Sequence, residues 1–195
     1  MHYNEESSLE SITVDGITFN LLESESNTHY IGLSGNQIIK IEVCPNEMKL
    51  RTLDEEVQVL KYLNSHNCKS CPRLLAHGKL EDGRPYFIEE RIIPHSQPVL
   101  TDILLALFEQ KHLGVYQGDL HPRNIIFDGK VTYLVDYDQA IMTEEIIDMD
   151  EIEFLDWVLE QDIPAYVLER GNLQLHFSEF IRLMSKLHYI VSLSD

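Results

Sequence analysis

Residues 116–140, YQGDLHPRNIIFDGKVTYLVDYDQA, constrain the fold of this chain more than any other stretch. Two apolar runs, NIIF and VTYLV, are typical of buried strands, and the pair Asp128-Gly129 between them predicts a tight hairpin turn. Polar side chains stand near the ends of these strands: Asp119, Asn124, Asp136 and Asp138. Carboxylates beside a hydrophobic core are costly to desolvate unless a partner offsets their charge. The fold must therefore bring such a partner to this hairpin.

A divalent cation is the partner that this arrangement predicts. The hairpin returns Asp136 to the neighbourhood of Asn124, so two oxygen ligands for a hard cation lie side by side. Mg²⁺ often takes only one or two protein ligands and completes its coordination with water and substrate phosphates. Asp119 stands beside them as a carboxylate able to accept a proton or to orient a hydroxyl. We therefore expect a metal and a phosphate-bearing substrate among these carboxylates.

The N-terminal half of the sequence predicts a small antiparallel sheet with one inserted helix. Residues 12–22 and 28–43 are rich in β-branched residues around short turns, which is typical of hairpins. Residues 72–93 return to strands around the turn EDGR. Between them, residues 51–65 carry apolar side chains at helical spacing, which predicts an amphipathic helix.

The C-terminal half predicts mainly helices around the hairpin. Helices are expected over residues 100–114, 144–161 and 176–193, and Gly114 is a typical stop for the first of them. The sequence therefore predicts an α+β fold in one domain, residues 1–195. Its N-terminal lobe would cover about 11–92 and its reduced, mostly helical C-terminal lobe about 98–195.

The formal charge of −18 restricts the choice of partners. A strongly acidic surface repels nucleic acid and anionic lipid headgroups, so neither is expected to bind. Neutral or cationic substrates fit this charge, as does a nucleotide that arrives with Mg²⁺. The longest apolar runs, such as ILLALF, are too short to span a bilayer, and the first ten residues are too polar for a secretory signal. We expect a cytoplasmic protein, with a translocated effector as the alternative.

The cysteines leave two interpretations open. Cys68 and Cys71 have the C-x-x-C spacing of a zinc knuckle or a redox site. A tetrahedral zinc site needs two further ligands, for which His66 and His77 are the nearest candidates. Without a secretion signal, these two thiols and Cys44 are expected to be reduced.

Lys40 lies in the middle of the apolar strand IIKIEV, where a buried ammonium group needs a carboxylate partner. Glu56 in the predicted helix 51–65 can supply one across the packing of the sheet and the helix.

These residues resemble the motifs of the protein-kinase-like phosphotransferases over residues 17–140. The run GDLHPRN matches the D-x-x-x-x-N spacing of the kinase catalytic loop, and Asp136-Tyr137-Asp138 stands in the place of D-F-G. Lys40 matches the lysine of the third strand, and Glu56 matches its partner in the helix.

The resemblance implies a kinase-like fold, ATP as cofactor with Mg²⁺ or Mn²⁺, and a role for each matching residue. Lys40 would hold the α and β phosphates with Glu56 as its partner, and Asp119 would be the catalytic aspartate. Because Lys40 would then serve phosphates more than packing, we expect Lys40→Ala to remove activity and leave the fold intact. Asn124 and Asp136 would bind the metal. The segment 89–92 would meet adenine through backbone groups, with Glu90 and Ile92 in contact. Ser24 and Ser26 would offer donors to the phosphates.

Four departures from the family pattern indicate which kind of kinase the sequence resembles. The phosphate-covering loop reads ESESNT and has no glycine, and Asp138 replaces the glycine of D-F-G. No A-P-E sequence follows, and the link PHSQPV after the hinge is short. The run QGDLHPRNI is similar to the pattern of bacterial sugar, lipopolysaccharide-core and antibiotic kinases, with Gln117 at the first histidine. The acidic surface argues against a purely anionic, lipopolysaccharide-like substrate.

The leading interpretation is a kinase that moves the γ-phosphoryl group of ATP to a hydroxyl of a sugar, glycan or small molecule. Two alternatives remain open. One is a minimal protein Ser/Thr kinase, such as a bacterial effector. The other is a catalytically silent, nucleotide-binding pseudokinase or scaffold, which the glycine-free loop favours.

Overall fold

The computed structural model describes residues 10–22, 29–43, 52–96, 98, 100–120 and 122–160. Some predictions fall outside these ranges. Ser24 and Ser26, predicted to contact phosphates, lie outside the described residues, as do Cys44 and the helix expected over 176–193.

A six-stranded antiparallel sheet forms the first half of the described chain, as expected. Its strands are β1 (Ser11–Val14), β2 (Ile17–Leu21), β3 (His29–Ser34), β4 (Gln37–Glu42), β5 (Leu74–Lys79) and β6 (Pro85–Glu90). They lie in the order β1-β2-β3-β4-β6-β5, so β4 and β6 are neighbouring interior strands. Asp15 and Gly16 both have positive φ, of 51° and 79°, as a two-residue hairpin turn requires.

Helix α1 (Leu53–Ser65) is inserted between β4 and β5, as predicted. Thr52 caps its N-terminus by accepting a hydrogen bond from the backbone N–H of Glu55, while the Glu55 carboxylate accepts one from the N–H of Thr52. The predicted apolar face is buried, and Glu56 is buried with it. A charged side chain thus enters the interior on the packed face of the helix.

The second half contains helices around two small sheets, with these elements: α2 (Leu100–Lys111), β7 (Val115–Tyr116), the 3₁₀ turn η1 (Pro122–Asn124), β8 (Ile125–Phe127), β9 (Thr132–Leu134), β10 (Ile141–Met142), α3 (Glu144–Asp148) and α4 (Glu151–Glu160). The predicted hairpin is confirmed as β8–β9, in which Ile125 pairs with Leu134. The pairing of β7 with β10 was not predicted, because two-residue strands are too short to leave a pattern.

One predicted helix is wrong in its extent. Residues 144–161 were expected to form a single helix, but α3 ends at Asp148 and α4 begins at Glu151. Asp150 causes the break, because its side chain accepts hydrogen bonds from the N–H groups of Ile152 (2.8 Å) and Glu153 (2.9 Å). Glu153 accepts one in return from the N–H of Asp150 (3.1 Å). This is a capping box, which starts a new helix rather than continuing the old one.

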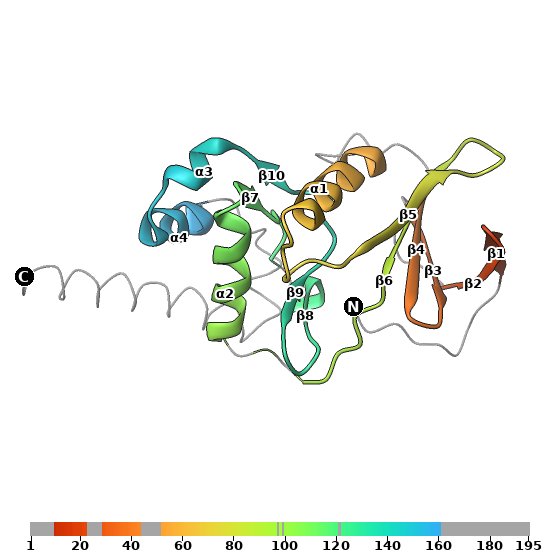
Figure 1. Cartoon of the computed structure of the whole chain (residues 1–195), viewed down its shortest axis with the longest axis horizontal. Helices are drawn as coiled ribbons and strands as arrows, with labels where there is room; N and C mark the ends of the chain where they lie inside the picture. Colours follow the sequence, from red (N-terminus) through yellow and green to blue (C-terminus); the bar gives the residue numbers. More distant parts are fainter. Residues whose placement is uncertain are drawn as a thin grey trace, which may run out of the picture.

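One large hydrophobic cluster joins α1 to the second half of the chain, including α2, the β8–β9 hairpin and α4. Figure 1 shows α1 between the six-stranded sheet on one side and α2, α3 and α4 on the other. The two-lobed α+β architecture is therefore confirmed, with α1 held by both lobes. In the part of the chain that the structure describes, no helix has the length and apolar character needed to cross a membrane.

Candidate active site

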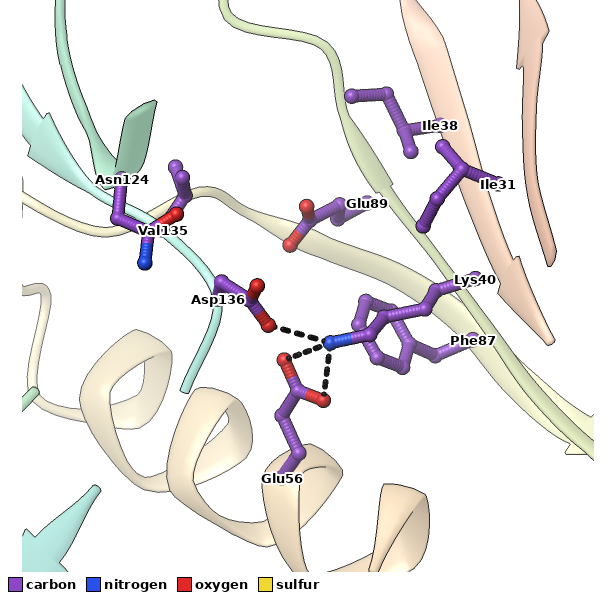
Figure 2. A pocket seen from close by; sticks show the side chains of 9 residues that line it. All are labelled: Ile31, Ile38, Lys40, Glu56, Phe87, Glu89, Asn124, Val135 and Asp136. Atoms are coloured by element: carbon purple, nitrogen blue, oxygen red, sulfur yellow. Dashed lines mark hydrogen bonds and ion pairs between the residues drawn. The ribbon is translucent and has the colours of Figure 1, made fainter. Parts of the chain in front are cut away.

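Strand β4 delivers Lys40 to the junction between the two lobes. The side chain is almost fully buried, and its ammonium group lies 2.8 Å and 3.0 Å from the two carboxylate oxygens of Glu56. It also lies 2.6 Å from Oδ1 of Asp136, which follows β9 (Figure 2). The predicted pairing of Lys40 with Glu56 is thus present. The second partner, Asp136, was not expected.

Two carboxylates keep Lys40 charged in this buried position. Burial alone would lower the pKa of Lys40, but the charges of Asp136 and Glu56 outweigh it and raise the pKa well above its ordinary value. Removing the ammonium group would leave Glu56, which is 2% exposed, without its counter-charge. This revises our expectation that Lys40→Ala leaves the fold intact.

Glu56 also ties α1 to the segment that carries Asp136. Its Oε1 accepts a hydrogen bond from the backbone N–H of Tyr137 at 3.1 Å. The Tyr137 ring is buried, and its hydroxyl accepts a hydrogen bond from Gln110 of α2 at 2.7 Å. The position of Glu56, and with it that of Lys40, therefore depends on contacts from both lobes.

Gln117 fixes the backbone of Asp136 and is a residue whose role the sequence reasoning missed. Its side-chain amide donates to the carbonyl oxygens of Val135 (2.8 Å) and Asp136 (2.7 Å), and its Oε1 accepts from the N–H of Asp119 (2.8 Å). Asp136 has a φ of 65°, which is uncommon for a residue other than glycine and needs support from its surroundings. One fully buried amide thus sets Asp136 relative to Asp119.

Gly118 allows this close approach between the loop and the segment after Asp136. It has a φ of 89°, and a Cβ atom at this position would lie 2.0 Å from the carbonyl oxygen of Gln139. Neither the conformation nor the space suits another residue.

Asp119 and Asn124 lie together, as predicted. The Asn124 side-chain amide donates to the carboxylate of Asp119 at 2.9 Å and to the carbonyl oxygen of Asp119 at 3.1 Å. Burial, together with the charges of Asp136 and Asp138, raises the pKa of Asp119. A raised pKa makes a carboxylate a better proton acceptor, which suits the role predicted for Asp119.

The donor set at the junction fits Mg²⁺. Asn124 uses its amide nitrogen toward Asp119, which leaves its amide oxygen for the pocket that it lines with Asp136. An amide oxygen and a carboxylate are the hard ligands that Mg²⁺ takes. Among the described residues, no group of three or more His, Cys, Asp or Glu side chains is placed to hold a metal ion. A metal at Asn124 and Asp136 would therefore depend on water and on phosphate oxygens.

A pocket opens beside these charged groups. It is lined by the side chains of Ile31, Ile38, Lys40, Glu56, Phe87, Glu89, Asn124, Val135 and Asp136 (Figure 2). Ile31, Ile38 and Phe87 lie on the sheet, and Val135 lies across from them on the segment after β9. Such apolar walls beside a charged end suit a ligand with a flat apolar part and an anionic part.

Glu89 enters this pocket, whereas Glu90 and Ile92 are not among its lining residues. Glu89 pairs with Ile38 across the β4–β6 ladder, and Phe87 pairs with Lys40, so these alternate positions share the pocket face. The N–H of Glu90 is already bonded to the carbonyl oxygen of Arg73 at 2.9 Å. The sequence placed Glu89 only in a backbone hinge. The alternation of strand β6 indicates that Glu89 and Glu90 point to opposite faces of the sheet, and the register with β4 decides which of them faces the pocket.

We expect Glu89→Gln to stabilise the protein at alkaline pH. Burial, with the charge of Glu56, raises the pKa of Glu89 from 4.5 to about 8. The folded state then holds a proton that the unfolded state releases between these pH values, so stability falls as the pH rises through this window. The glutamine variant cannot lose this proton, so its stability relative to the wild type should rise by on the order of 4 kcal/mol between pH 5 and pH 9.

Urea unfolding at the two pH values measures this difference. Glu81→Gln, which removes a carboxylate from an exposed turn, is the matched control and should leave the difference near zero. An equal effect in the two variants would show that Glu89 does not hold its proton in the folded state.

These elements and contacts together decide the architecture. A sheet with an inserted helix presents an ion-paired lysine and glutamate, and a following loop and hairpin present Asp119, Asn124 and Asp136. The fold is protein-kinase-like. These groups follow one another along the chain in the order that the kinase motifs predict.

Comparison with solved structures matched this chain to several kinases at low sequence identity. The bifunctional kinase-methyltransferase WbdD is 12% identical, with a TM-score of 0.49 over 88% of this chain and 53% of that chain. Vaccinia related kinase 3 is 14% identical, with a TM-score of 0.44 over 75% of this chain and 56% of that chain. The Cydia pomonella granulovirus kinase PK-1 is 13% identical, with a TM-score of 0.43 over 65% of this chain and 53% of that chain.

The chain spans about half the length of these structures. No protein-family model matches the chain, and no curated protein matches it.

Proposed function

We propose that this protein is a phosphotransferase that uses ATP and Mg²⁺ to phosphorylate a hydroxyl of a sugar, glycan or other small molecule. In this proposal, residues 1–195 form one kinase-like domain. Lys40 binds phosphate oxygens, Asn124 and Asp136 hold the metal, and Asp119 accepts the proton of the acceptor hydroxyl. Catalysis rests mainly on positioning and on neutralising charge.

The observation that carries this proposal is the pairing of Lys40 with both Glu56 and Asp136 in a pocket that also has apolar walls. A buried ammonium group held between two lobes is costly to build and contributes little to stability compared with an apolar contact. Its value lies in presenting a fixed positive charge to an anionic ligand. Asp119, held 2.9 Å from the amide of Asn124, adds a proton acceptor next to one proposed metal ligand.

The choice of a small acceptor rests on two further points. Asp138 adds a third acid near the proposed metal site, and its charge contributes to the raised pKa values of both Lys40 and Asp119. The sequence also lacks the A-P-E segment with which peptide-phosphorylating relatives shape a docking platform. Both points are typical of the small-molecule kinases that the motifs resemble.

We expect ATP to raise the melting temperature only when Mg²⁺ or Mn²⁺ is present. At a ligand concentration one hundred times Kd, binding to the folded state adds about 2.7 kcal/mol. For a chain of this size, that corresponds to a shift of roughly 5–10 °C. Without the metal, the triphosphate meets the carboxylates of Glu56, Asp136 and Asp138 with only Lys40 to offset them, so the shift should be small.

Differential scanning fluorimetry with ATP, with Mg²⁺, with both, and with EDTA measures this effect. Adenosine plus Mg²⁺ is the control, because it keeps the base and lacks the phosphates. A shift that is the same with and without metal would contradict the roles of Asn124 and Asp136.

A silent nucleotide-binding module is the second candidate, because Lys40 is already neutralised by two carboxylates. Incubation of γ-labelled ATP with sugars, aminoglycosides and lysate proteins separates the possibilities. Transfer to a small hydroxyl compound supports the proposal, and transfer to Ser or Thr in proteins supports a protein kinase. Metal-dependent binding without any transfer supports the silent module.

A further inference from the structure

The C-x-x-C segment lies in the bend between α1 and β5 and has no part in the proposed function. Cys71 is 4% exposed, whereas Cys68 is half-buried, and both are free thiols. The Cys71 sulfur lies 3.6 Å from the carbonyl oxygen of Cys68 and accepts a hydrogen bond from the Asn64 amide at 3.2 Å. The Cys68 sulfur lies 3.4 Å from the hydroxyl of Ser70. Both thiols thus face the interior of one short bend.

The two thiols differ in accessibility and in pKa, as the two members of a reactive pair do. Contact with the Cys71 thiol lowers the pKa of Cys68, and the same contact together with burial raises the pKa of Cys71. The more accessible sulfur is therefore the one that more readily forms a thiolate, which is the nucleophile in thiol oxidation. Across the described residues, no cluster of three or more metal-binding side chains includes these cysteines.

Hydrogen bonds connect this bend to the candidate active site. The Glu109 carboxylate of α2 accepts from the N–H groups of Lys69 (2.9 Å) and Ser70 (2.8 Å). The amide of the next residue, Gln110, donates to the carbonyl oxygen of Ser70 at 3.2 Å and to the Tyr137 hydroxyl at 2.7 Å.

From Tyr137 the connection reaches the lysine. The N–H of Tyr137 donates to Glu56, which pairs with Lys40. A change in the backbone between the two cysteines therefore moves groups that hold the phosphate-binding lysine. Gln110 is buried, and its Oε1 has no hydrogen-bond partner among the described residues, so it has few ways to compensate.

We propose that Cys68 and Cys71 are a reversible thiol-oxidation site that closes to an intramolecular disulfide and loosens the active site. Hydrogen peroxide is the oxidant: the Cys68 thiolate attacks one peroxide oxygen, the O–O bond breaks, and Cys68 becomes a sulfenic acid as hydroxide leaves. The Cys71 sulfur then attacks the Cys68 sulfur, the disulfide forms, and the sulfenic oxygen leaves as water with the Cys71 proton. A dithiol such as dithiothreitol restores both thiols by exchange.

Closing the disulfide requires the Cys71 sulfur to give up its contact with Asn64 and turn toward Cys68. Ser70 lies between the two cysteines, so its bonds to Glu109 and Gln110 are strained or lost. We therefore expect oxidation to weaken Mg-ATP binding several-fold and to lower the melting temperature. The bond formation itself does not depend on the proposed function.

The sequence provides a direct measurement of this bond. Trypsin cleaves after Lys69, which separates the peptides 62–69 and 70–73 when the thiols are free. After brief treatment of the full chain with peroxide and alkylation of the remaining thiols, we expect these two peptides to appear joined. Dithiothreitol should separate them again, and Cys68→Ser and Cys71→Ser should prevent the joined product. Cys44→Ser is the matched control and should leave it unchanged.

Three outcomes would overturn the proposal. Cys68 could oxidise to the sulfinic acid without a joined peptide, which would show that Cys71 does not reach it. Peroxide could consume Cys44 alone. The joined peptide could form with no change in melting temperature or Mg-ATP binding, which would remove the link to the active site. If the reduced protein binds no Mg-ATP, the proposed function fails, and the joined peptide and the melting temperature still decide this proposal.

Discussion

Asp119→Asn should abolish phosphoryl transfer and leave Mg-ATP binding nearly unchanged. The amide keeps the size of the carboxylate and cannot accept the proton of the acceptor hydroxyl. Loss of a general base typically costs on the order of 10²–10⁴ in rate. Nucleotide binding should persist because Asp119 is not among the residues that line the pocket, and its carboxylate bonds to Asn124. Isothermal titration with Mg-ATP and a single-turnover assay measure the two properties separately.

Asp136→Asn is the matched comparison, because it makes the same chemical change at a residue with a different role. Asp136 holds Lys40 at 2.6 Å and is a proposed metal ligand, so its amide variant should weaken metal-dependent nucleotide binding as well as transfer. Equal losses of nucleotide binding in the two variants would contradict the separate roles of Asp119 and Asp136. Retained transfer in Asp119→Asn would contradict its role as proton acceptor.

The parts of the fold that the sequence predicts well are those set by local chemistry. The hairpin β8–β9 follows from Asp128-Gly129 between two apolar runs, and α1 follows from its apolar spacing. The contact of Lys40 with Glu56 was also predicted, because a buried ammonium group has few possible partners. The one large error among the described elements, the break before α4, arose because a capping box was read as the interior of a longer helix.

The missed features of the site depend on contacts between residues far apart in the sequence. Asp136 meets Lys40 from a backbone conformation with positive φ, and the Gln117 amide donates a hydrogen bond to its carbonyl oxygen. No spacing rule indicates either feature. For Glu89 and Glu90, two adjacent acids on one strand, the register with β4 decides which side chain enters the pocket. That register is a property of the assembled sheet, so the sequence alone left Glu89 in a backbone role.

Lys40→Met should remove activity and also destabilise the fold. The two effects have different causes and can be measured separately. The methionine keeps the apolar stem, so the change isolates the ammonium group. Without it, the buried Glu56 carboxylate is left unpaired and the partly exposed Asp136 loses a partner. Breaking a buried ion pair in this way typically costs about 3–5 kcal/mol at neutral pH. The loss should be smaller at pH 5, because Glu56 can then take up a proton in the folded state and lose its uncompensated charge.

A double variant separates the two effects of Lys40→Met. Adding Glu56→Gln removes the buried charge that the single variant leaves unpaired, and the amide still accepts the hydrogen bond from the N–H of Tyr137. We expect the double variant to recover much of the stability in urea unfolding and none of the phosphoryl transfer, because the positive charge for the phosphates is still absent. Recovery of transfer together with stability would show that Lys40 serves only the fold. A Lys40→Met variant as stable as the wild type would contradict the buried ion pair itself.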